Sequence, residues 1–231
     1  DIARDMQVKA VSLDSNVGGG CIGLDVPAKV RKTVGLSNLL ASTEWSKRKG
    51  SLPCCPAIDV YGIPVVFDIA DLPHIIIAGT TGSGKSVFMN AMLLSLMASG
   101  ADFRLIIADG KGEDFAPHYA RSSRLMQDMT DDSGDIPAIA TDAETIKRQV
   151  LWITAEMDRR FATGEKPYPI IFITDELADI VMQDGKDRAI TKAIARISQK
   201  ARSAKISMML ATQYPVTKVI DPIIAVNTPS R

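Results

Sequence analysis

Short apolar runs alternate with longer stretches of helical periodicity from residue 61 onward. The runs at residues 75–78, 105–108, 170–174 and 208–212 are continuous, as in strands that are buried on both faces. Two intervening stretches repeat apolar residues every three or four positions, which predicts one face of a helix. These repeats are Ile146, Val150, Ile153, Met157 and Phe161, and then Ile190, Ile194, Ile197 and Ala201. Alternating strands and helices predict an α/β fold with a mostly parallel sheet.

The first sixty residues have a different pattern. Short β-like runs at 8–13 and 21–24 are mixed with three consecutive glycines at 18–20 and with several prolines, and residues 37–45 predict a short helix. We therefore expect a small α+β domain at 1–60 and a larger domain at 61–231. A basic stretch, Lys29, Arg31 and Lys32, is interpreted as a solvated rim. Because the chain begins at Asp1 and stops without an obvious terminating element, we expect it to be part of a longer protein.

A glycine-rich loop follows the first strand of the larger domain and matches the pattern G-x-x-x-x-G-K-[ST]. A strand enters the loop and a helix leaves it, so main-chain N–H groups can converge on phosphate oxygens. We expect Lys85 to contact the β- and γ-phosphates of ATP and the Ser86 hydroxyl to bind Mg²⁺. The alternative is a glycine turn without a nucleotide. The expected binding residues are Gly79, Thr80, Thr81, Gly82, Ser83, Gly84, Lys85, Ser86 and Val87.

Two acids, Asp175 and Glu176, end the third strand. Because open parallel sheets bind ligands at the carboxyl ends of their strands, these acids and the glycine loop are expected in one crevice. Asp175 is a candidate Mg²⁺ ligand through its water shell, and Glu176 a candidate base for the water that attacks the γ-phosphate. A surface-charge role is the alternative. An acid pair at this position favours hydrolysis over phosphoryl transfer to a substrate hydroxyl.

Gln213 follows the fourth strand and is a candidate sensor of the γ-phosphate, or a turn cap. Arg202 is a candidate arginine finger for a neighbouring subunit. The alternative is that it extends a basic stripe that faces solvent, formed by Arg188, Lys192, Arg196 and Lys200. The Asp109-Gly110-Lys111-Gly112 turn lies at another strand end, where it contacts the nucleotide or serves only as a turn. His74 and His118 are isolated, so we expect no metal site at either residue.

The overall charge does not identify a partner. Lys plus Arg and Asp plus Glu number 27 each, a balance that neither suggests nor excludes nucleic acid. The three cysteines, of which Cys54 and Cys55 are adjacent, suit neither paired disulfides nor a zinc site, so we expect a reducing, cytoplasmic setting. No apolar run reaches eighteen residues, and we expect no membrane contact from this chain, although a longer protein could be tethered to the inner membrane.

Several motifs together resemble the FtsK/SpoIIIE family of double-stranded DNA translocases. They are residues 74–86 followed by Asn90-Ala91-Met92, then 175–179, 195–204, 211–213 and 227–231. The likeness extends upstream to Val26-Pro27 with Val34 and to residues 59–65. The resemblance implies a RecA-like P-loop NTPase fold of the ASCE type, with ATP and Mg as cofactors. It also implies a homo-hexameric ring that pumps duplex DNA, and it strengthens Arg202 as the finger.

The chain departs from the family pattern at several points. Asp109-Gly110-Lys111 stands where the family usually has Asp-Pro-Lys, and Tyr214-Pro215 where it has Arg-Pro. Ala225 stands where a DNA-contacting lysine is often found, with Lys218 nearby, and the segment between Phe161 and Ile170 is short. These departures concern DNA contact and cellular role, on chromosome, plasmid or phage DNA. The alternative functions are an ATPase of a conjugation or protein-secretion system and a scaffold that binds ATP without turnover.

Overall fold

The computed structural model describes residues 11–14, 23–26, 33–217 and 219–228. The chain divides into two compact units, residues 1–35 and 36–231. In the first unit, β1 (Ser12–Asp14) pairs antiparallel with β2 (Gly23–Asp25). The three glycines at 18–20, Cys21 and the basic stretch at 29–32 lie outside the described residues, as does Lys218. The division into domains at residues 60 and 61 stays a prediction.

The second unit begins with two short helices, α2 (Leu36–Leu40) and α3 (Thr43–Ser46), where the sequence suggested one. Ser42 separates them because its extended backbone begins a new helix and its hydroxyl accepts a hydrogen bond from the Trp45 amide at 3.1 Å. An antiparallel hairpin of β3 (Pro53–Ile58) and β4 (Pro64–Asp68) follows. It carries Cys54 and Cys55, both buried free thiols.

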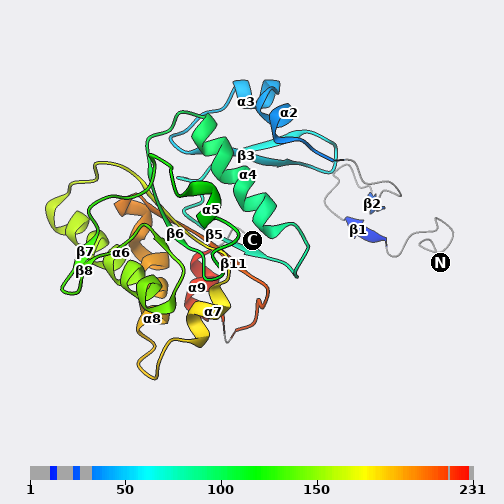
Figure 1. Ribbon diagram of the computed structural model, residues 1–231. Coiled ribbons are helices and arrows are strands. Elements are labelled where there is room, and N and C mark those ends of the chain that lie inside the picture. The colour runs from blue at the N-terminus through cyan, green and yellow to red at the C-terminus, as the bar shows by residue number, and fades with distance from the viewer. Residues whose placement is uncertain (1–10, 15–22, 27–32, 218, 229–231) are drawn as a thin grey trace. The chain divides into compact units, whose positions relative to one another are not determined.

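The central sheet of this unit lies among its helices (Figure 1). It consists of five parallel strands in the order β5-β11-β10-β6-β9. Their bounds are β5 (His74–Ala78), β6 (Arg104–Ala108), β9 (Ile139–Ala140), β10 (Ile170–Thr174) and β11 (Ile206–Thr212). A small hairpin, β7 (Thr130–Asp131) and β8 (Gly134–Asp135), precedes β9. The predicted α/β fold with a mostly parallel sheet is therefore confirmed.

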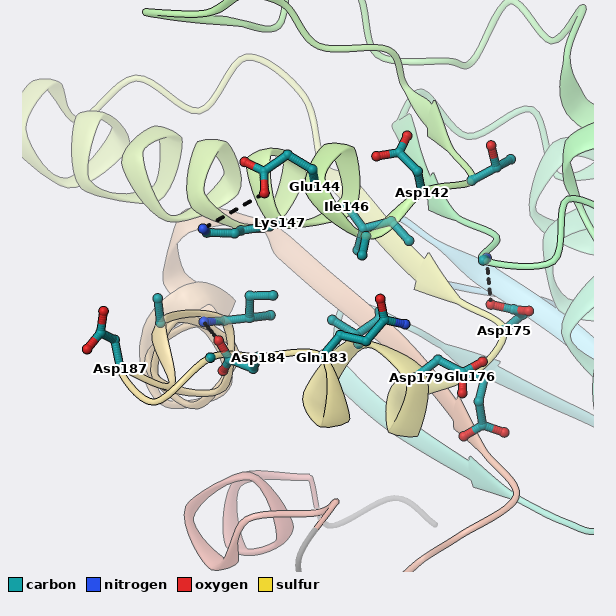
Figure 2. Close-up of a pocket in the computed structure, with 17 residues that line it drawn as sticks. Asp142, Glu144, Ile146, Lys147, Asp175, Glu176, Asp179, Gln183, Asp184 and Asp187 are labelled. Atoms are coloured by element: carbon teal, nitrogen blue, oxygen red, sulfur yellow. Dashed lines mark hydrogen bonds and ion pairs between the residues drawn. The ribbon is translucent and has the colours of Figure 1, made fainter.

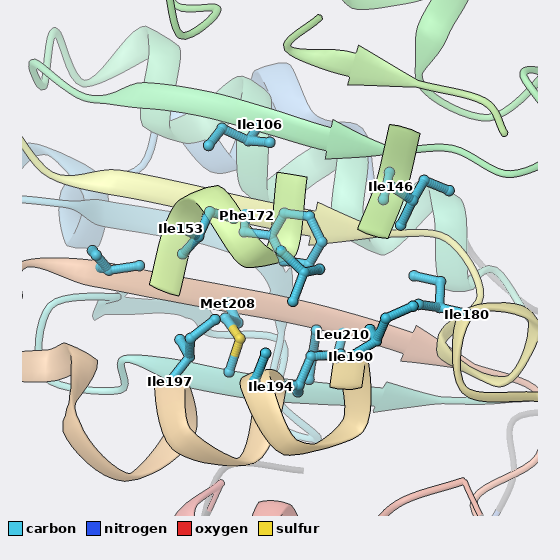
Figure 3. Packing of buried hydrophobic residues seen from close by; sticks show 14 of the residues in the cluster. Ile106, Ile146, Ile153, Phe172, Ile180, Ile190, Ile194, Ile197, Met208 and Leu210 are labelled. Carbon is cyan, nitrogen blue, oxygen red and sulfur yellow. The ribbon is translucent and has the colours of Figure 1, made fainter. Parts of the chain in front are cut away.

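Helices cover both faces of the sheet. Alternate residues of β10 show this: Ile170 and Phe172 belong to one buried cluster, and Ile171 and Ile173 to the other. The first cluster includes the apolar faces of α6 (Ala143–Thr163) and α8 (Ala189–Lys200), as Figure 3 shows. The second includes α4 (Lys85–Ala98) and the short α5 (Ala116–Tyr119). The remaining helices are α7 (Leu177–Met182), the 3-10 helix η1 (Ala201–Ala204) and α9 (Pro222–Asn227).

The last turn of α6 departs from the predicted pattern. Phe161 is 45% exposed, whereas Arg160 beside it is fully buried. The Arg160 guanidinium donates to Glu156 at 2.7 Å and to the carbonyl oxygens of Tyr168 and Ala204 at 2.8 and 2.9 Å. Arg160 therefore joins the end of α6 to the short connection before β10 and to η1. Within the described residues, no helix is both long and apolar enough to span a bilayer.

Candidate nucleotide-binding and hydrolysis site

The loop between β5 and α4 has the backbone of an anion-binding turn. Gly82 and Gly84 have φ values of 76° and 97°, in the left-handed region that favours glycine. The loop is closed by hydrogen bonds from the Ser83 amide to the Thr80 carbonyl at 3.0 Å and from the Gly79 amide to the Thr212 carbonyl at 3.2 Å. Gly84 caps α4 without a side chain, so the first amides of the helix remain available to an anion.

Lys85 joins this loop to the end of β10. Its Nζ donates to the main-chain oxygen of Asp175 at 3.1 Å and lies 3.9 Å from Oε2 of Glu176. The side chain is 10% exposed, and Ser86 follows it in the first turn of α4. A cation and the free amides of a helix therefore face the two acids at the carboxyl edge of the sheet.

Asp175 is 5% exposed. Its Oδ1 accepts a hydrogen bond from the Gly110 amide at 3.2 Å, and its Oδ2 has no partner among the described residues. Burial, and to a lesser degree the negative charge of Asp109, raises the pKa of Asp175 to about 6. A buried carboxylate oxygen without a partner fits an Mg²⁺ site, because a cation or one of its waters would satisfy that oxygen.

Glu176 is 4% exposed and caps the N-terminus of α7. Its Oε1 accepts from the Ala178 amide at 3.1 Å and from the Thr212 hydroxyl at 2.7 Å, and its Oε2 accepts from the Gln213 amide at 2.9 Å. The Gln213 side chain lies against the glycine loop, because the Thr81 hydroxyl donates to its Oε1 at 2.7 Å. The structure therefore brings Lys85, Asp175, Glu176 and Gln213 together.

Arg202 lies elsewhere. It belongs to η1, just before the amino end of β11, whereas Gln213 follows the carboxyl end of that strand. Seven residues of strand separate the two edges by roughly 20 Å. The Arg202 side chain is 65% exposed, and its only ion pair within the described part of the chain is a 3.8 Å contact with exposed Asp71. Arg202 is thus outside the cluster formed by Lys85 and the two acids of its own chain.

The basic residues that precede Arg202, at the N-cap of α8 and along this helix, are exposed. Arg188 pairs with Asp221 at 3.5 Å, and Arg196 forms a bidentate pair with Asp158 at 2.7 and 2.8 Å. These cations lie on the solvent side of the helix, opposite its buried isoleucines.

The sequence matches the model of the FtsK/SpoIIIE family over residues 35–163 and 162–217. The chain belongs to the FtsK/SpoIIIE family. It is 32% identical over 255 residues to the DNA translocase SftA of Bacillus subtilis and 31% identical over 276 residues to the DNA translocase FtsK of Pseudomonas aeruginosa. Both alignments cover 100% of this chain but only 25% and 32% of those proteins, so the chain spans about a quarter to a third of their length.

Solved structures support the P-loop ATPase fold of this FtsK/SpoIIIE member. The pCW3 conjugation coupling protein TcpA, in a monomer form with ATPgS, superposes with a TM-score of 0.65 at 17% identity, over 99% of this chain and 66% of TcpA. The cytoplasmic domain of the Thermomonospora curvata Type VII secretion ATPase EccC gives 0.58 at 16% identity, over 84% of this chain and 24% of that one. The two segments of the family match meet at residues 162 and 163, beside the short connection that follows α6.

The Asp109 turn, where this chain departs from the family pattern, contributes more to the site than the sequence alone suggested. Asp109 is fully buried and accepts hydrogen bonds from the amides of Phe115 and Ala116 at 2.9 and 2.8 Å, at the start of α5. Gly110, the next residue, contacts Asp175. The position of Asp109 at a strand end was the one sequence signal for this role.

Asn90, which the sequence indicates only as part of the family motif, forms two side-chain hydrogen bonds. Its side chain donates to the Ser86 carbonyl at 2.9 Å and accepts from the Tyr119 hydroxyl at 2.8 Å. The hydrogen bond from Tyr119 joins α5 to the second turn of α4, and Asn90 reaches the first turn through Ser86. Hydrogen bonds from Asn90 and from the Asp109 turn therefore support the start of α4 and Asp175.

An acidic cavity of about 460 Å³ lies beside the two acids, between the start of α6 and the segment that joins α7 to α8 (Figure 2). Asp142, Glu144, Asp179, Asp184 and Asp187 line it together with Asp175 and Glu176. None of residues 79–86 lines this cavity. Its negative charge disfavours a polyphosphate, so the phosphate groups of a nucleotide belong on the Lys85 side of Asp175.

The residues present fit ATP and Mg²⁺. The glycine loop, the free helix amides and Lys85 suit a polyphosphate, and Asp175 Oδ2 suits the cation. In the described ranges no group of three or more His, Cys, Asp or Glu side chains forms a metal cage of its own.

Proposed function

We propose that this chain is the ATPase subunit of a double-stranded DNA translocase that hydrolyses Mg-ATP in a homo-hexameric ring and pumps duplex DNA. The observation that carries the proposal is the convergence of Lys85, Asp175, Glu176 and Gln213 on the glycine loop of a chain from the FtsK/SpoIIIE family. The matched relatives named DNA translocases support DNA as the polymer.

Each residue has a defined part in the proposed reaction. The loop amides and Lys85 hold the β- and γ-phosphates, and Ser86 and Asp175 hold Mg²⁺, which neutralises charge on the phosphate oxygens when bound. Glu176 accepts a proton from the attacking water through Oε2, the oxygen nearest Lys85. Gln213 senses the γ-phosphate, and its hydrogen bonds with Thr81 and Glu176 couple that contact to the glycine loop and to the base.

In this proposal a neighbouring subunit supplies an arginine to each active site, in addition to the site's own Lys85. Arg202 is exposed and distant from its own Lys85, so its guanidinium is available to the active site of another copy. Such a head-to-tail contact uses two different surfaces and closes into a ring when the rotation between copies allows it. An arginine delivered in this way stabilises the charge that develops on the transferred phosphoryl group.

A second candidate is an ATPase of a conjugation or protein-secretion system, acting in the cytoplasm on another polymer. The observations that favour it are the similar folds of TcpA and EccC and the balanced charge of the chain. In the DNA motor, by contrast, affinity comes mainly from phosphate contacts and falls steeply with salt.

Electron microscopy separates these proposals. The chain is mixed with a slowly hydrolysed ATP analogue and linear duplex DNA at low salt, and the same mixture is prepared with Lys85→Ala as the control. Rings threaded by duplex in the wild-type sample alone support the motor. Rings that never contain duplex favour an ATPase of a secretion or conjugation system. A sample that stays monomeric contradicts the proposed hexameric ring.

A further inference from the structure

Three groups among the described residues donate hydrogen bonds to the Glu176 carboxylate. Two are main-chain amides, of Ala178 and Gln213, and the third is the hydroxyl of Thr212 at 2.7 Å. Thr212 is fully buried at the last position of β11, and the neighbouring strand β10 directly precedes the two acids. Its hydroxyl is the one donor of the three that a substitution can remove.

The direction of the Thr212 hydroxyl proton is fixed by its other partner. The Tyr214 amide donates to Thr212 Oγ1 at 3.0 Å, so this oxygen already accepts one hydrogen bond. A hydroxyl has a single proton to donate, and the carboxylate oxygen at 2.7 Å accepts it. A hydrogen bond of this length to a carboxylate is charge-assisted and stronger than a neutral one.

These bonds give the two oxygens of Glu176 different surroundings. Oε1 accepts from both Thr212 and Ala178, which accounts for both of its lone pairs. Oε2 accepts from Gln213 alone among the described donors within hydrogen-bond distance and faces Lys85 at 3.9 Å. One oxygen is therefore anchored, and the other is directed towards the glycine loop.

Thr212 also contacts the loop itself. Its carbonyl oxygen accepts from the Gly79 amide at 3.2 Å, and its Cα partner in β5 is Ala78. The same residue thus joins the start of the phosphate-binding loop to the carboxylate of Glu176. A change in the angle of that carboxylate would move Oε2 relative to the phosphates, and misplacement of a reacting group by about 1 Å can cost about a hundredfold in rate.

We propose that Thr212 is a positioning residue for hydrolysis. Its hydroxyl anchors Oε1 of Glu176, so that Oε2 faces the water that attacks the γ-phosphate. The inference rests on the proposed function, because it takes Glu176 as the base. The Thr212 hydroxyl touches neither substrate nor water in this account and acts only through Glu176.

The test compares Thr212→Val, Thr212→Ser and Glu176→Gln in steady-state ATP hydrolysis. We expect Thr212→Val to lower kcat about tenfold or more with KM for ATP within about twofold, because binding is intact and the base is displaced. Thr212→Ser keeps the hydroxyl and should keep most of kcat. If the valine variant does not fold, Thr212→Ala removes the same hydroxyl and replaces it in the comparison. Thermal melting of each variant reports folding.

A double variant distinguishes positioning from a general structural role. In a Glu176→Gln background, Thr212→Val should cause little further loss, because Thr212 acts through the carboxylate that is already removed. An equal loss in both backgrounds, or an unchanged kcat in Thr212→Val and Thr212→Ala, would overturn the proposal for Thr212. A Glu176→Gln variant that hydrolyses ATP at the wild-type rate would instead contradict Glu176 as the base, and with it the proposed function.

Discussion

The main-chain amide of Gly110 donates a hydrogen bond of 3.2 Å to Oδ1 of Asp175, and so ties the turn after β6 to the candidate Mg²⁺ ligand at the end of β10. The other oxygen, Oδ2, has no partner in the described part of the chain. Asp175 is therefore held in a buried site that disfavours its charge, and its pKa is raised to about 6. Destabilising burial of a charged group is common at catalytic sites, where a residue is placed for chemistry at a cost in stability.

Asp175→Asn should abolish ATP hydrolysis and stabilise the ligand-free chain. Because the pKa of Asp175 is raised in the folded chain, the carboxyl group does not destabilise the fold below about pH 4, where it is protonated. Stability is lost as pH rises through 6, and at pH 8 the buried charge costs up to roughly 3 kcal/mol of unfolding free energy. Asparagine removes that cost and can still accept from Gly110. Urea unfolding with EDTA should show a stability gain at pH 8 that shrinks towards pH 4. A variant less stable than wild type at pH 8 would contradict the claim that the buried charge of Asp175 destabilises the fold.

Mixed assemblies test the role of Arg202. Arg202→Ala and Lys85→Ala should each lower hydrolysis by roughly a thousandfold when alone, since one lacks the finger and the other the phosphate contact. Mixed in equal amounts, about one interface in four pairs an intact site with an intact finger, so activity should return to at most about a quarter of wild type. No recovery would contradict a finger that acts between subunits. Lys200→Ala, an exposed cation two residues away, is the matched control and should remain active.

Arg160 should be essential for folding. Arg160→Met leaves Glu156 and two carbonyl oxygens without their buried donor, a loss of about 3–5 kcal/mol in the free energy of unfolding. Its neighbour Arg159 also pairs with Glu156 at 2.7 Å, but its side chain is 42% exposed. Arg159→Met should therefore cost no more than about 1 kcal/mol. Urea unfolding measures both losses. Equal losses in the two variants would show that burial of the Arg160–Glu156 pair does not increase its contribution to the free energy of unfolding.

His74 should make the fold sensitive to acid. It is 1% exposed at the start of β5, neither ring nitrogen has a partner within the described residues, and burial lowers its pKa to about 4. A depressed pKa means that stability is retained above 6.5, the ordinary value, and lost as pH falls towards 4, by up to roughly 3 kcal/mol. His74→Leu should lose less stability than wild type between pH 7 and pH 4.5. His118→Gln, which removes the exposed second histidine, is the matched control.

Strand positions could be predicted closely because each apolar run ends at a glycine or a polar residue. The run before Asp175 coincides with β10, whereas β11 begins two residues before its predicted start, since Ile206 and Ser207 did not stand out from the preceding helix. The helix expected at 37–45 is divided because Ser42 caps a new one. These differences come from local hydrogen bonds that periodicity does not report.

The contacts within the site depend on strand order, which the sequence does not supply. Thr212 reaches Glu176 only because β11 lies beside β10, although some thirty residues separate these strands along the chain. The same holds for Gly110 and Asp175, which follow the neighbouring strands β6 and β10. Residue types at strand ends indicated which chemistry to expect, and the roles of Lys85, Asp175, Glu176, Gln213 and Arg202 stay predictions.

The most direct test of the proposed DNA motor is the steady-state rate of ATP hydrolysis at low salt, with and without long linear duplex DNA. We expect duplex to raise the rate severalfold, the stimulation to disappear as salt is raised, and Lys85→Ala to be inactive under every condition. A wild-type rate that is the same with and without duplex, across the salt series, would contradict the account.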